Sequence, residues 1–237
     1  MREPATRTAH LEPESAPVRQ TRRDDILDMA GRMFRERGYH ATSMRDLAKA
    51  LDLRGSSLYA HFAAKEDVLW EIVTRAAAAF EAAIDAVPDG LAPRERLGAM
   101  ITAHLGVVAA ELETATVFFQ DWLHLAPARR SAMVAVRDAY QQQFVDAIAE
   151  GRDAGDFPVD DPRMSALIVL SALNWSYQWL DPSGRLDLEA VASAYVRQLL
   201  DGVAASAARP APPDVSAAAG PVHQALTGAA RGRAAVR

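Results

Sequence analysis

Apolar residues recur every three to four positions over most of the chain, which is the spacing of one face of an α-helix. No stretch of useful length alternates apolar and polar residues in the way a half-buried strand does. The pattern therefore predicts an all-α fold of about nine helices. The predicted helices cover residues 22–37, 43–51, 56–62, 65–85, 94–112, 115–124, 128–150, 161–180 and 187–204.

Capping residues mark where the first helices begin and end. Thr21 with Asp24 resembles a capping box at the start of the first helix, and Gly38 is a suitable stop after it. Thr42 or Ser43 can cap the second helix. Proline and glycine punctuate the later elements in the same way.

The two ends of the chain lack this periodicity. Residues 1–18 hold three prolines and are expected to form a disordered arm, and residues 206–237, dominated by Ala, Pro, Gly and Arg, a disordered tail. Between them we expect a DNA-binding domain at 19–66 and a ligand-binding and dimerisation domain at 67–205, for the reasons given next.

Charge is distributed unevenly around residue 65. The segment from Arg19 to Lys65 holds ten basic and six acidic residues, whereas the chain from Glu66 onward holds 14 basic and 22 acidic residues. A basic segment on an acidic body is typical of a DNA-binding head joined to a domain that does not bind DNA, although chance asymmetry gives the same numbers.

Residues 43–62 have the form of a helix-turn-helix. Two short helices flank a turn at 52–55, in which Leu53 is the buried residue. With Leu58 and Phe62 turned inward, the second helix presents mainly small hydroxyls, an aromatic hydroxyl and an imidazole. Such a helix suits the major groove of DNA, and the alternative is a solvated helix of an ordinary helical hairpin.

Three motifs at fixed spacing favour the DNA-binding interpretation. They are GYHATSMRDLA at 38–48, SLYAHF at 57–62 and KEDVL at 65–69. Together they resemble the N-terminal signature of the TetR family of repressors over roughly residues 21–72. The resemblance implies a three-helix DNA-binding head, a helical ligand-binding body and a homodimer on a palindromic operator.

The resemblance also implies roles for single residues. Thr42 and Ser43 would hold one phosphate and Lys65 another, while Tyr59 and His61 would contact the backbone. Arg45 either reads a base or pairs with a neighbour such as Asp46. The family commonly has Gly where this chain has Asp52, and Arg54 and Ser56 also depart from its pattern, which leaves the base contacts open. The candidate DNA-binding residues are Thr42, Ser43, Arg45, Arg54, Gly55, Ser56, Ser57, Tyr59, His61 and Lys65.

Aromatic and polar residues gather at three places in the body. A ligand cavity needs apolar walls and a few polar anchors, and these clusters offer both, although ordinary core packing is the alternative. Arg137 is the expected anion anchor, unless it pairs with Asp121 or Asp138 and faces solvent. The candidate ligand-binding residues are Phe118, Trp122, Arg137, Tyr140, Phe144, Asn174, Trp175, Gln178 and Trp179.

The body is also similar to one branch of the family. Residues 95–203 resemble regulators of fatty-acid, phenylacetate and sterol breakdown, several of which respond to acyl-CoA thioesters. Members often have a basic residue where this chain has Gln178. The apolar stripe of 188–203 either packs within the chain or, as the resemblance implies, joins the helix at 161–180 in a four-helix dimer interface.

Composition narrows the remaining classes. Cysteine is absent, which excludes disulfides and thiolate metal sites, and His104, His124 and His223 are too scattered to predict a metal site. No apolar run is long enough for a membrane span, no signal-peptide core is seen, and a cytoplasmic protein is expected. No catalytic motif is present, so no enzyme and no cofactor are expected.

These observations lead to one leading hypothesis about function. The chain is expected to be a repressor that a small-molecule effector, an organic anion or acyl-CoA thioester, releases from double-stranded operator DNA. The alternative is a constitutive dimeric DNA-architectural protein that has no effector, which a close-packed body without a cavity would favour.

Overall fold

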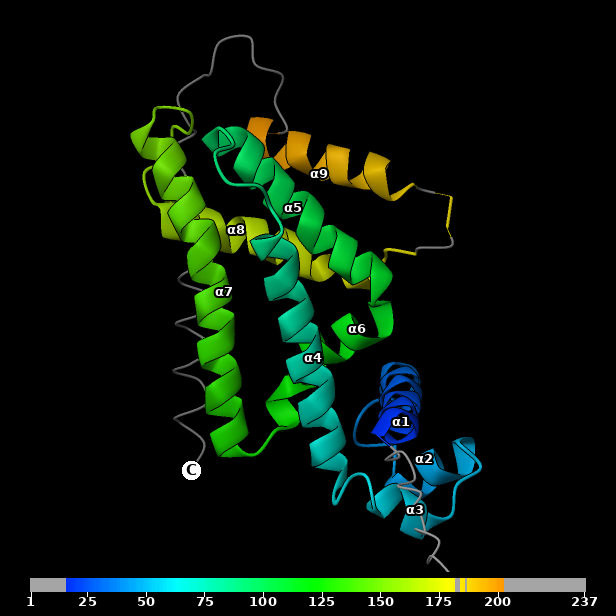
Figure 1. Cartoon of the computed structure of the whole chain (residues 1–237). Coiled ribbons are helices and arrows are strands. Elements are labelled where there is room, and N and C mark those ends of the chain that lie inside the picture. Colours follow the sequence, from blue (N-terminus) through cyan, green and yellow to red (C-terminus); the bar gives the residue numbers. More distant parts are fainter. Residues whose placement is uncertain (1–15, 182–183, 186, 203–237) are drawn as a thin grey trace, which may run out of the picture. The chain divides into compact units, whose positions relative to one another are not determined.

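The computed structural model describes residues 16–181, 184–185 and 187–202, with side chains from residue 22 onward. Within these residues every regular element is helical, as the periodicity predicts (Figure 1). The α-helices are α1 (Ala16–Arg37), α2 (Met44–Ala50), α3 (Gly55–Tyr59), α4 (Lys65–Asp85), α5 (Pro93–Ala110), α6 (Leu112–Gln120), α7 (Pro127–Asp153), α8 (Pro162–Asn174) and α9 (Leu188–Asp201). Two 3-10 helices, η1 (Trp122–His124) and η2 (Trp175–Gln178), follow α6 and α8.

The expected helices at 115–124 and 161–180 each divide into an α-helix and a 3-10 helix, and the expected start of the first helix was wrong. The first helix begins at Ala16 rather than near residue 22, so Thr21 and Asp24 lie inside it and form no capping box. The Asp24 carboxylate instead accepts a hydrogen bond from Arg75 of α4 at 2.9 Å. Residues 16–18 of the expected arm therefore belong to α1, whereas the rest of the arm and the tail at 206–237 lie outside the described residues.

The start of α2 follows the predicted chemistry. The Ser43 hydroxyl accepts from the Asp46 backbone N–H at 3.1 Å, and the Asp46 carboxylate accepts from the Ser43 backbone N–H at 3.1 Å. This reciprocal capping box leaves two of the free donors at the helix start satisfied. It selects Ser43, not Thr42, as the cap.

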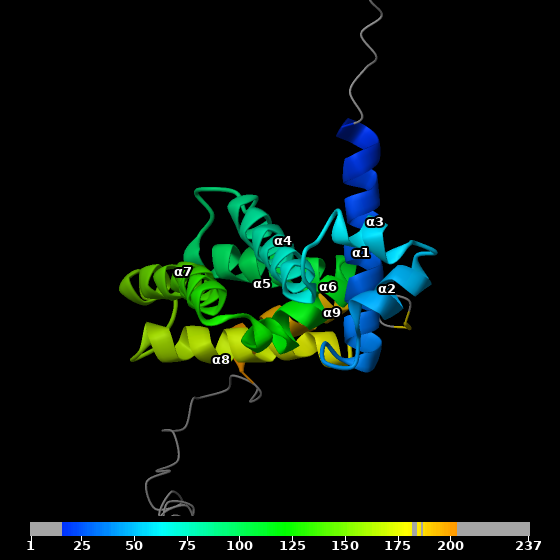
Figure 2. The ribbon, with the colours of Figure 1, turned by 90° about the horizontal axis from the view of Figure 1, so that it is seen from below.

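The first apolar core lies among α1, α2, α3 and α4 and continues into α6. Phe34, Leu47, Leu58 and Phe62 are almost completely buried there, and Figure 2 shows α2 and α3 beside α1. Leu58 and Phe62 are thus turned inward, as the sequence predicts. The three short helices are thus held as one head.

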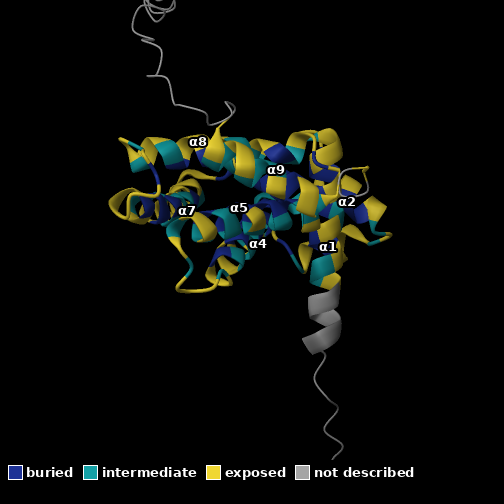
Figure 3. Cartoon of the chain, turned by 90° about the horizontal axis from the view of Figure 1, so that it is seen from above, coloured by how far each residue is buried: buried dark blue, intermediate teal, exposed yellow. Residues whose placement is uncertain are grey.

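A second core joins α5, α7, α8 and α9. Leu105, Phe144 and Leu173 are fully buried in it, and Figure 3 shows the buried positions on the sides of the helices that face one another. The apolar stripe of α9 packs into this core through the buried Ala192, whereas Val191 is buried in the first core. The stripe was expected to pack either within the chain or in a dimer interface. The structure shows it packed within the chain.

Helix α4 contributes to both parts. It packs against α1 and also against α5, α6 and α7, so the expected boundary between residues 66 and 67 falls at the start of a shared helix. No single helix among the described residues is long and apolar enough to cross a membrane, and α5 and α6 satisfy the length and composition test only as a pair bent by 104°.

Candidate functional site

The turn between α2 and α3 depends on a left-handed residue. Asp52 has φ of 52°, and among the described residues it is the non-glycine residue with positive φ. The following N–H, of Leu53, donates to the Ala48 carbonyl at 2.8 Å and closes the turn. The glycine that the family commonly has here is thus replaced by a residue for which the same conformation has a steric cost.

Helix α3 presents the predicted reading face to solvent. Leu58 is fully buried and Tyr59, the next residue, is 56% exposed. Arg54 precedes the helix without a side-chain cap bond, and Arg45 forms no ion pair with Asp46 among the described side chains. The exposed candidates are Ser43, whose hydroxyl is part of the α2 capping box, and Arg45, Arg54, Gly55, Ser56, Ser57 and Tyr59.

Thr42 and Lys65 are engaged inside the head. The Thr42 hydroxyl is buried, 3.1 Å from the Gly38 carbonyl and 3.3 Å from that of Met33. The Lys65 ammonium donates to the carbonyls of Tyr39 at 2.7 Å and of Thr42 at 2.8 Å. Partial burial lowers the pKa of Lys65. Both side chains therefore hold the turn before α2, and their contacts with phosphate stay predictions.

The end of α3 is fixed by an arginine of α1. Arg23 donates to the His61 carbonyl at 2.9 Å and to the Glu71 carboxylate of α4 at 2.7 Å. Its guanidinium lies 4.1 Å from the centre of the Phe62 ring. The interaction with Glu71 raises the pKa of Arg23. These contacts orient α3 and the half-buried His61 ring relative to α4.

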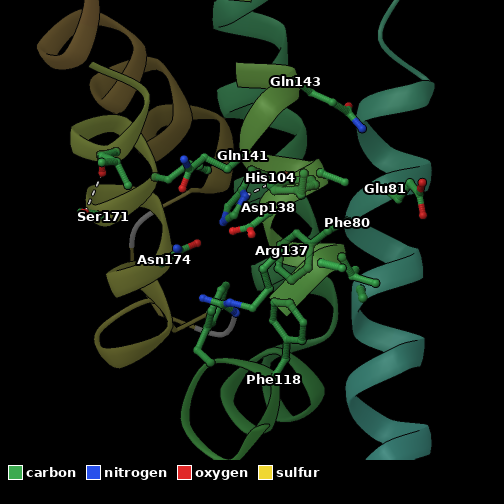
Figure 4. A pocket seen from close by; sticks show the side chains of 18 residues that line it. Phe80, Glu81, His104, Phe118, Arg137, Asp138, Gln141, Gln143, Ser171 and Asn174 are labelled. Atoms are coloured by element: carbon green, nitrogen blue, oxygen red, sulfur yellow. Dashed lines mark hydrogen bonds between the residues drawn. The ribbon is translucent and has the colours of Figure 1, made fainter. Parts of the chain in front are cut away.

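The body contains a cavity of about 490 Å³ that is partly open to solvent. Side chains from α4, α5, α6, α7 and α8 line it (Figure 4), with apolar walls that include Phe80, Phe118 and Leu170. This volume lies within the usual range for small-molecule sites. The alternative of a DNA-architectural protein without an effector predicts a close-packed body. The structure has a cavity there instead.

Four of the nine candidate ligand residues line this cavity: Phe118, Arg137, Tyr140 and Asn174. Trp122 lies beside it, because the Arg137 guanidinium is 5.1 Å from its ring centre. Phe144 is buried in the second core, next to Tyr140.

The remaining three candidates lie elsewhere. Trp175, Gln178 and Trp179 are exposed and do not line the cavity. The cause is the change from α-helix to 3-10 helix after Asn174, since three residues per turn shift the direction of the side chains that follow. The Trp179 ring instead stacks on Tyr195 of α9.

Arg137 is the only cationic side chain among the lining residues, which also include Glu81 and Asp138. Its guanidinium lies 5.1 Å from the ring centres of both Phe118 and Trp122. No ion pair joins it to Asp121 or Asp138 among the described side chains. Burial lowers the pKa of Arg137, against a smaller opposing effect of Asp138. An anion in the cavity would supply the partner that the chain withholds.

Sequence reasoning missed Phe80 and His104 as cavity residues. His104 is the polar position on the buried face of α5 and is 1% exposed. Its Nδ1 lies 2.9 Å from the Tyr140 hydroxyl, and its ring centre is 4.7 Å from that of Phe80. Burial lowers the pKa of His104 to about 3 and raises that of Tyr140. The sequence signal that could have indicated His104 is a single histidine among the apolar residues on the buried face of α5.

Helix η1 connects the cavity wall to the head. Trp122 at its start lies beside Arg137, while His124 at its end stacks on Tyr39, with ring centres 5.4 Å apart. His124 Nδ1 also lies 3.0 Å from Nε2 of His40, in the turn between α1 and α2. One short element therefore contacts both Arg137 of the cavity wall and the turn before α2 in the head.

A second link joins α7 to α4. Arg129 donates to the Asp67 carboxylate at 2.7 Å, and the Glu66 carboxylate accepts from the Ala126 backbone N–H at 3.1 Å. The neighbouring carboxylates raise the pKa of Arg129. The start of α7 is thereby tied to the first turn of the helix that leaves the head.

Two family descriptions match the chain. "Bacterial regulatory proteins, tetR family" matches residues 26–72, and "Tetracyclin repressor-like, C-terminal domain" matches residues 90–203. The TetR family transcriptional regulator PfmR from Thermus thermophilus is 33% identical, with a TM-score of 0.71 over 76% of this chain and 99% of that one. The chain belongs to the TetR family of transcriptional regulators.

Two further relatives of this TetR regulator bear on its function. The transcriptional repressor KstR2 of Rhodococcus jostii (strain RHA1) is 28% identical over 77% of this chain and 91% of that protein. The structure of AibR in complex with isovaleryl coenzyme A and operator DNA is 28% identical, with a TM-score of 0.70 over 76% of this chain and 98% of that one. The chain is therefore a DNA-binding transcriptional regulator, as its head predicts.

Proposed function

We propose that this TetR regulator is a homodimeric repressor, released from a palindromic operator by an organic anion with a large apolar part. The observation that carries the proposal is Arg137, a half-buried cation on the cavity wall that lies over two aromatic rings and has no carboxylate partner among the described side chains. A carboxylate or phosphate can meet a guanidinium with two charge-assisted hydrogen bonds.

An acyl-CoA thioester is the leading candidate. The related AibR binds isovaleryl coenzyme A, and the aromatic and aliphatic walls suit an acyl or ring portion. The volume suits that portion alone, and Glu81 and Asp138 disfavour several anionic groups inside. We therefore expect one phosphate of such a ligand to reach Arg137, and the rest of the nucleotide part to lie outside the cavity.

The proposed dimer uses α8 with the polar side of α9 beside it. Met164, Leu167, Ile168 and Trp175 are 39% to 62% exposed on α8 and η2, which is unusual for so many large apolar side chains on adjacent turns. Pairing this face between two copies would bury it and set two heads side by side. Heads spaced by one DNA turn, roughly 34 Å, would fit successive major grooves.

The proposed release couples the cavity to the head through η1 and α7. An anion that draws Arg137 away from Phe118 and Trp122 changes the packing of η1, which contacts Tyr39 and His40. The ligand acts only as far as it binds one arrangement of the heads more tightly than the other. The constitutive architectural protein is the second candidate, and the cavity argues against it.

The test is release of DNA by defined ligands. An operator fragment selected in vitro is bound to the dimer, and decanoyl-CoA, decanoic acid and decanol are titrated while fluorescence anisotropy is followed. We expect release by the anions and little by the alcohol, and a loss of that preference in Arg137→Met. Equal potency of the alcohol, or an unchanged Arg137→Met protein, contradicts the role of Arg137.

A control variant separates the charge from the fold. Arg152→Met removes an exposed arginine from the same helix, about four turns nearer its end and outside the cavity lining. It is expected to respond to the anions as the unmodified protein does. If no ligand of the series releases the DNA from either protein, the result favours the alternative of a DNA-architectural protein without an effector.

A further inference from the structure

Among the described side chains, one buried polar atom has no hydrogen-bond partner: Nε2 of His104. The ring lines the cavity, and Figure 4 shows it in the middle of the lining side chains. Nε2 lies at the tip of the imidazole, away from the α5 backbone. Buried polar groups in proteins are nearly always paired, so this atom calls for a reason.

The bond on the other side of the ring determines what Nε2 offers. Nδ1 lies 2.9 Å from the Tyr140 hydroxyl. Burial keeps the imidazole neutral, with a pKa lowered to about 3, and raises the pKa of Tyr140 so that the phenol keeps its proton. A phenol is the stronger acid and an imidazole nitrogen the stronger base, so we assign the O–H of Tyr140 as donor to Nδ1. In this tautomer Nε2 carries the hydrogen and is a donor without an acceptor.

Among the residues that the structure describes, no acceptor lies within hydrogen-bond distance of Nε2. The aromatic rings of Phe80 and Phe119 lie 4.7 Å and 6.2 Å from it, centre to centre. The cation of the cavity, Arg137, is itself a donor. The cavity therefore combines a charged donor at Arg137 with a neutral, buried donor at His104.

We propose that His104 is a specificity-determining residue of the cavity, whose Nε2–H donates to an uncharged oxygen, such as a carbonyl, on the apolar part of the effector. This inference rests on the proposed function in one respect, because both assume that the cavity binds a ligand. The effector class is then narrowed to an apolar acid or thioester with a neutral acceptor oxygen. That oxygen is either the thioester carbonyl or a ketone on the apolar body.

The first experiment uses neutral probes, so that it does not depend on the anion. Acetophenone and ethylbenzene differ by a carbonyl in place of a methylene, and their binding to the dimer is measured by calorimetry. In His104→Phe, the ratio of acetophenone to ethylbenzene affinity is expected to fall by about 10-fold, the size of one buried hydrogen bond. His104→Gln, whose amide N–H reaches a similar position, is expected to restore part of the preference.

A second experiment identifies the source of the oxygen. Decanoyl-CoA is compared with S-decyl-CoA, which lacks the thioester carbonyl, and decanoic acid with oxodecanoic acids that carry the ketone at successive carbons. If decanoyl-CoA binds more tightly than S-decyl-CoA and His104→Phe removes the difference, the acceptor oxygen is the thioester carbonyl. If His104→Phe instead removes a preference for one of the oxodecanoic acids over decanoic acid, the acceptor is a ketone. Arg137→Met is expected to weaken all of these ligands without changing either ratio.

A third measurement tests the inference without any ligand. The double variant His104→Phe with Tyr140→Phe removes both polar groups together, so neither is left unpaired. If His104 serves the ligand, this variant is expected to melt at or above the temperature of the unmodified protein. A large fall in melting temperature would mean that the pair serves folding and would overturn the proposal.

The outcomes separate the two proposals. An acetophenone ratio that is the same in the unmodified protein and in His104→Phe overturns the role of His104, even where anions bind. A ratio that depends on His104, together with no binding of any anion, supports this inference and contradicts the organic-anion effector.

Discussion

Replacing Asp121 by asparagine should stabilise the regulator, and by an amount that depends on pH. Asp121 follows α6 and is 7% exposed, with Oδ1 3.7 Å from Nε2 of His124. Burial raises the pKa of Asp121 from 3.8 to about 6, although electrostatic interactions with His40 and Lys65 act in the opposite direction. Its carboxylate is thus held ionised at neutral pH in a place that favours the neutral form.

The sign of the effect follows from that pKa. Because the folded chain binds the proton more tightly than the unfolded chain, the protonated carboxyl favours folding below about pH 4, and this advantage is lost as the pH rises through about 6. At a pH above both pKa values, the ionised carboxylate of Asp121 therefore lowers the free energy of unfolding by about 3 kcal/mol, relative to the protonated form. That is a large part of the stability of a typical domain.

The assay is urea unfolding between about pH 4 and pH 8, because the expected change lies across this range. Asp121→Asn should raise the free energy of unfolding by up to about 3 kcal/mol at the alkaline end and by little at the acidic end. Asp160→Asn, at an exposed aspartate, is the matched control and should change little at any pH. A gain that does not vary with pH, or a loss of stability near pH 8, would refute the reasoning.

Three further predictions concern the head and the dimer. Lys65→Met should lower the melting temperature, because the Tyr39 and Thr42 carbonyls lose a charged donor worth about 1.5–3 kcal/mol each at most. It should also weaken binding equally for all DNA sequences and flatten the salt dependence by about 0.9 per half-site, and an unchanged slope would limit Lys65 to holding the turn. Ile168→Lys should yield a folded monomer in sedimentation, because this side chain is 59% exposed in the single chain, and a persistent dimer would place the interface elsewhere. Asp52→Gly should raise the stability to heat by about 1 kcal/mol, because glycine adopts the φ of 52° without steric cost, and a loss would show that the carboxyl stabilises the turn.

Local features of the sequence were enough for the helices and the head. Helix α4 has the predicted bounds, Lys65–Asp85, because an apolar face and a start and stop signal are all contained in the segment itself. Ser43 and Asp46 form their capping box within four residues of one another. The head was found in the same way, since its motifs lie within one short stretch and their spacing is specific.

Contacts between distant segments were decided only by the tertiary structure. The periodicity of α9 showed an apolar face but not its partner, and the stripe packs on the chain's own core. The Lys65 ammonium donates hydrogen bonds to the carbonyls of Tyr39 and Thr42, which lie more than twenty residues earlier in the sequence. A pattern names the side of a helix that avoids water, whereas the neighbour that covers it depends on how all helices pack.

The cavity shows the same division most clearly. The sequence shows that aromatic side chains are available in the body and that Arg137 lies on the same helix as two of them, Tyr140 and Phe144. Which of them meet in space depended on helix packing and on the turn into 3-10 helix after Asn174, which directs Trp175 and Trp179 away. His104 became a candidate only when Tyr140, 36 residues later in the chain, was seen to take one of its nitrogens and leave the other unpaired. Burial and pairing are properties of all the neighbours at once, and no single helix encodes them.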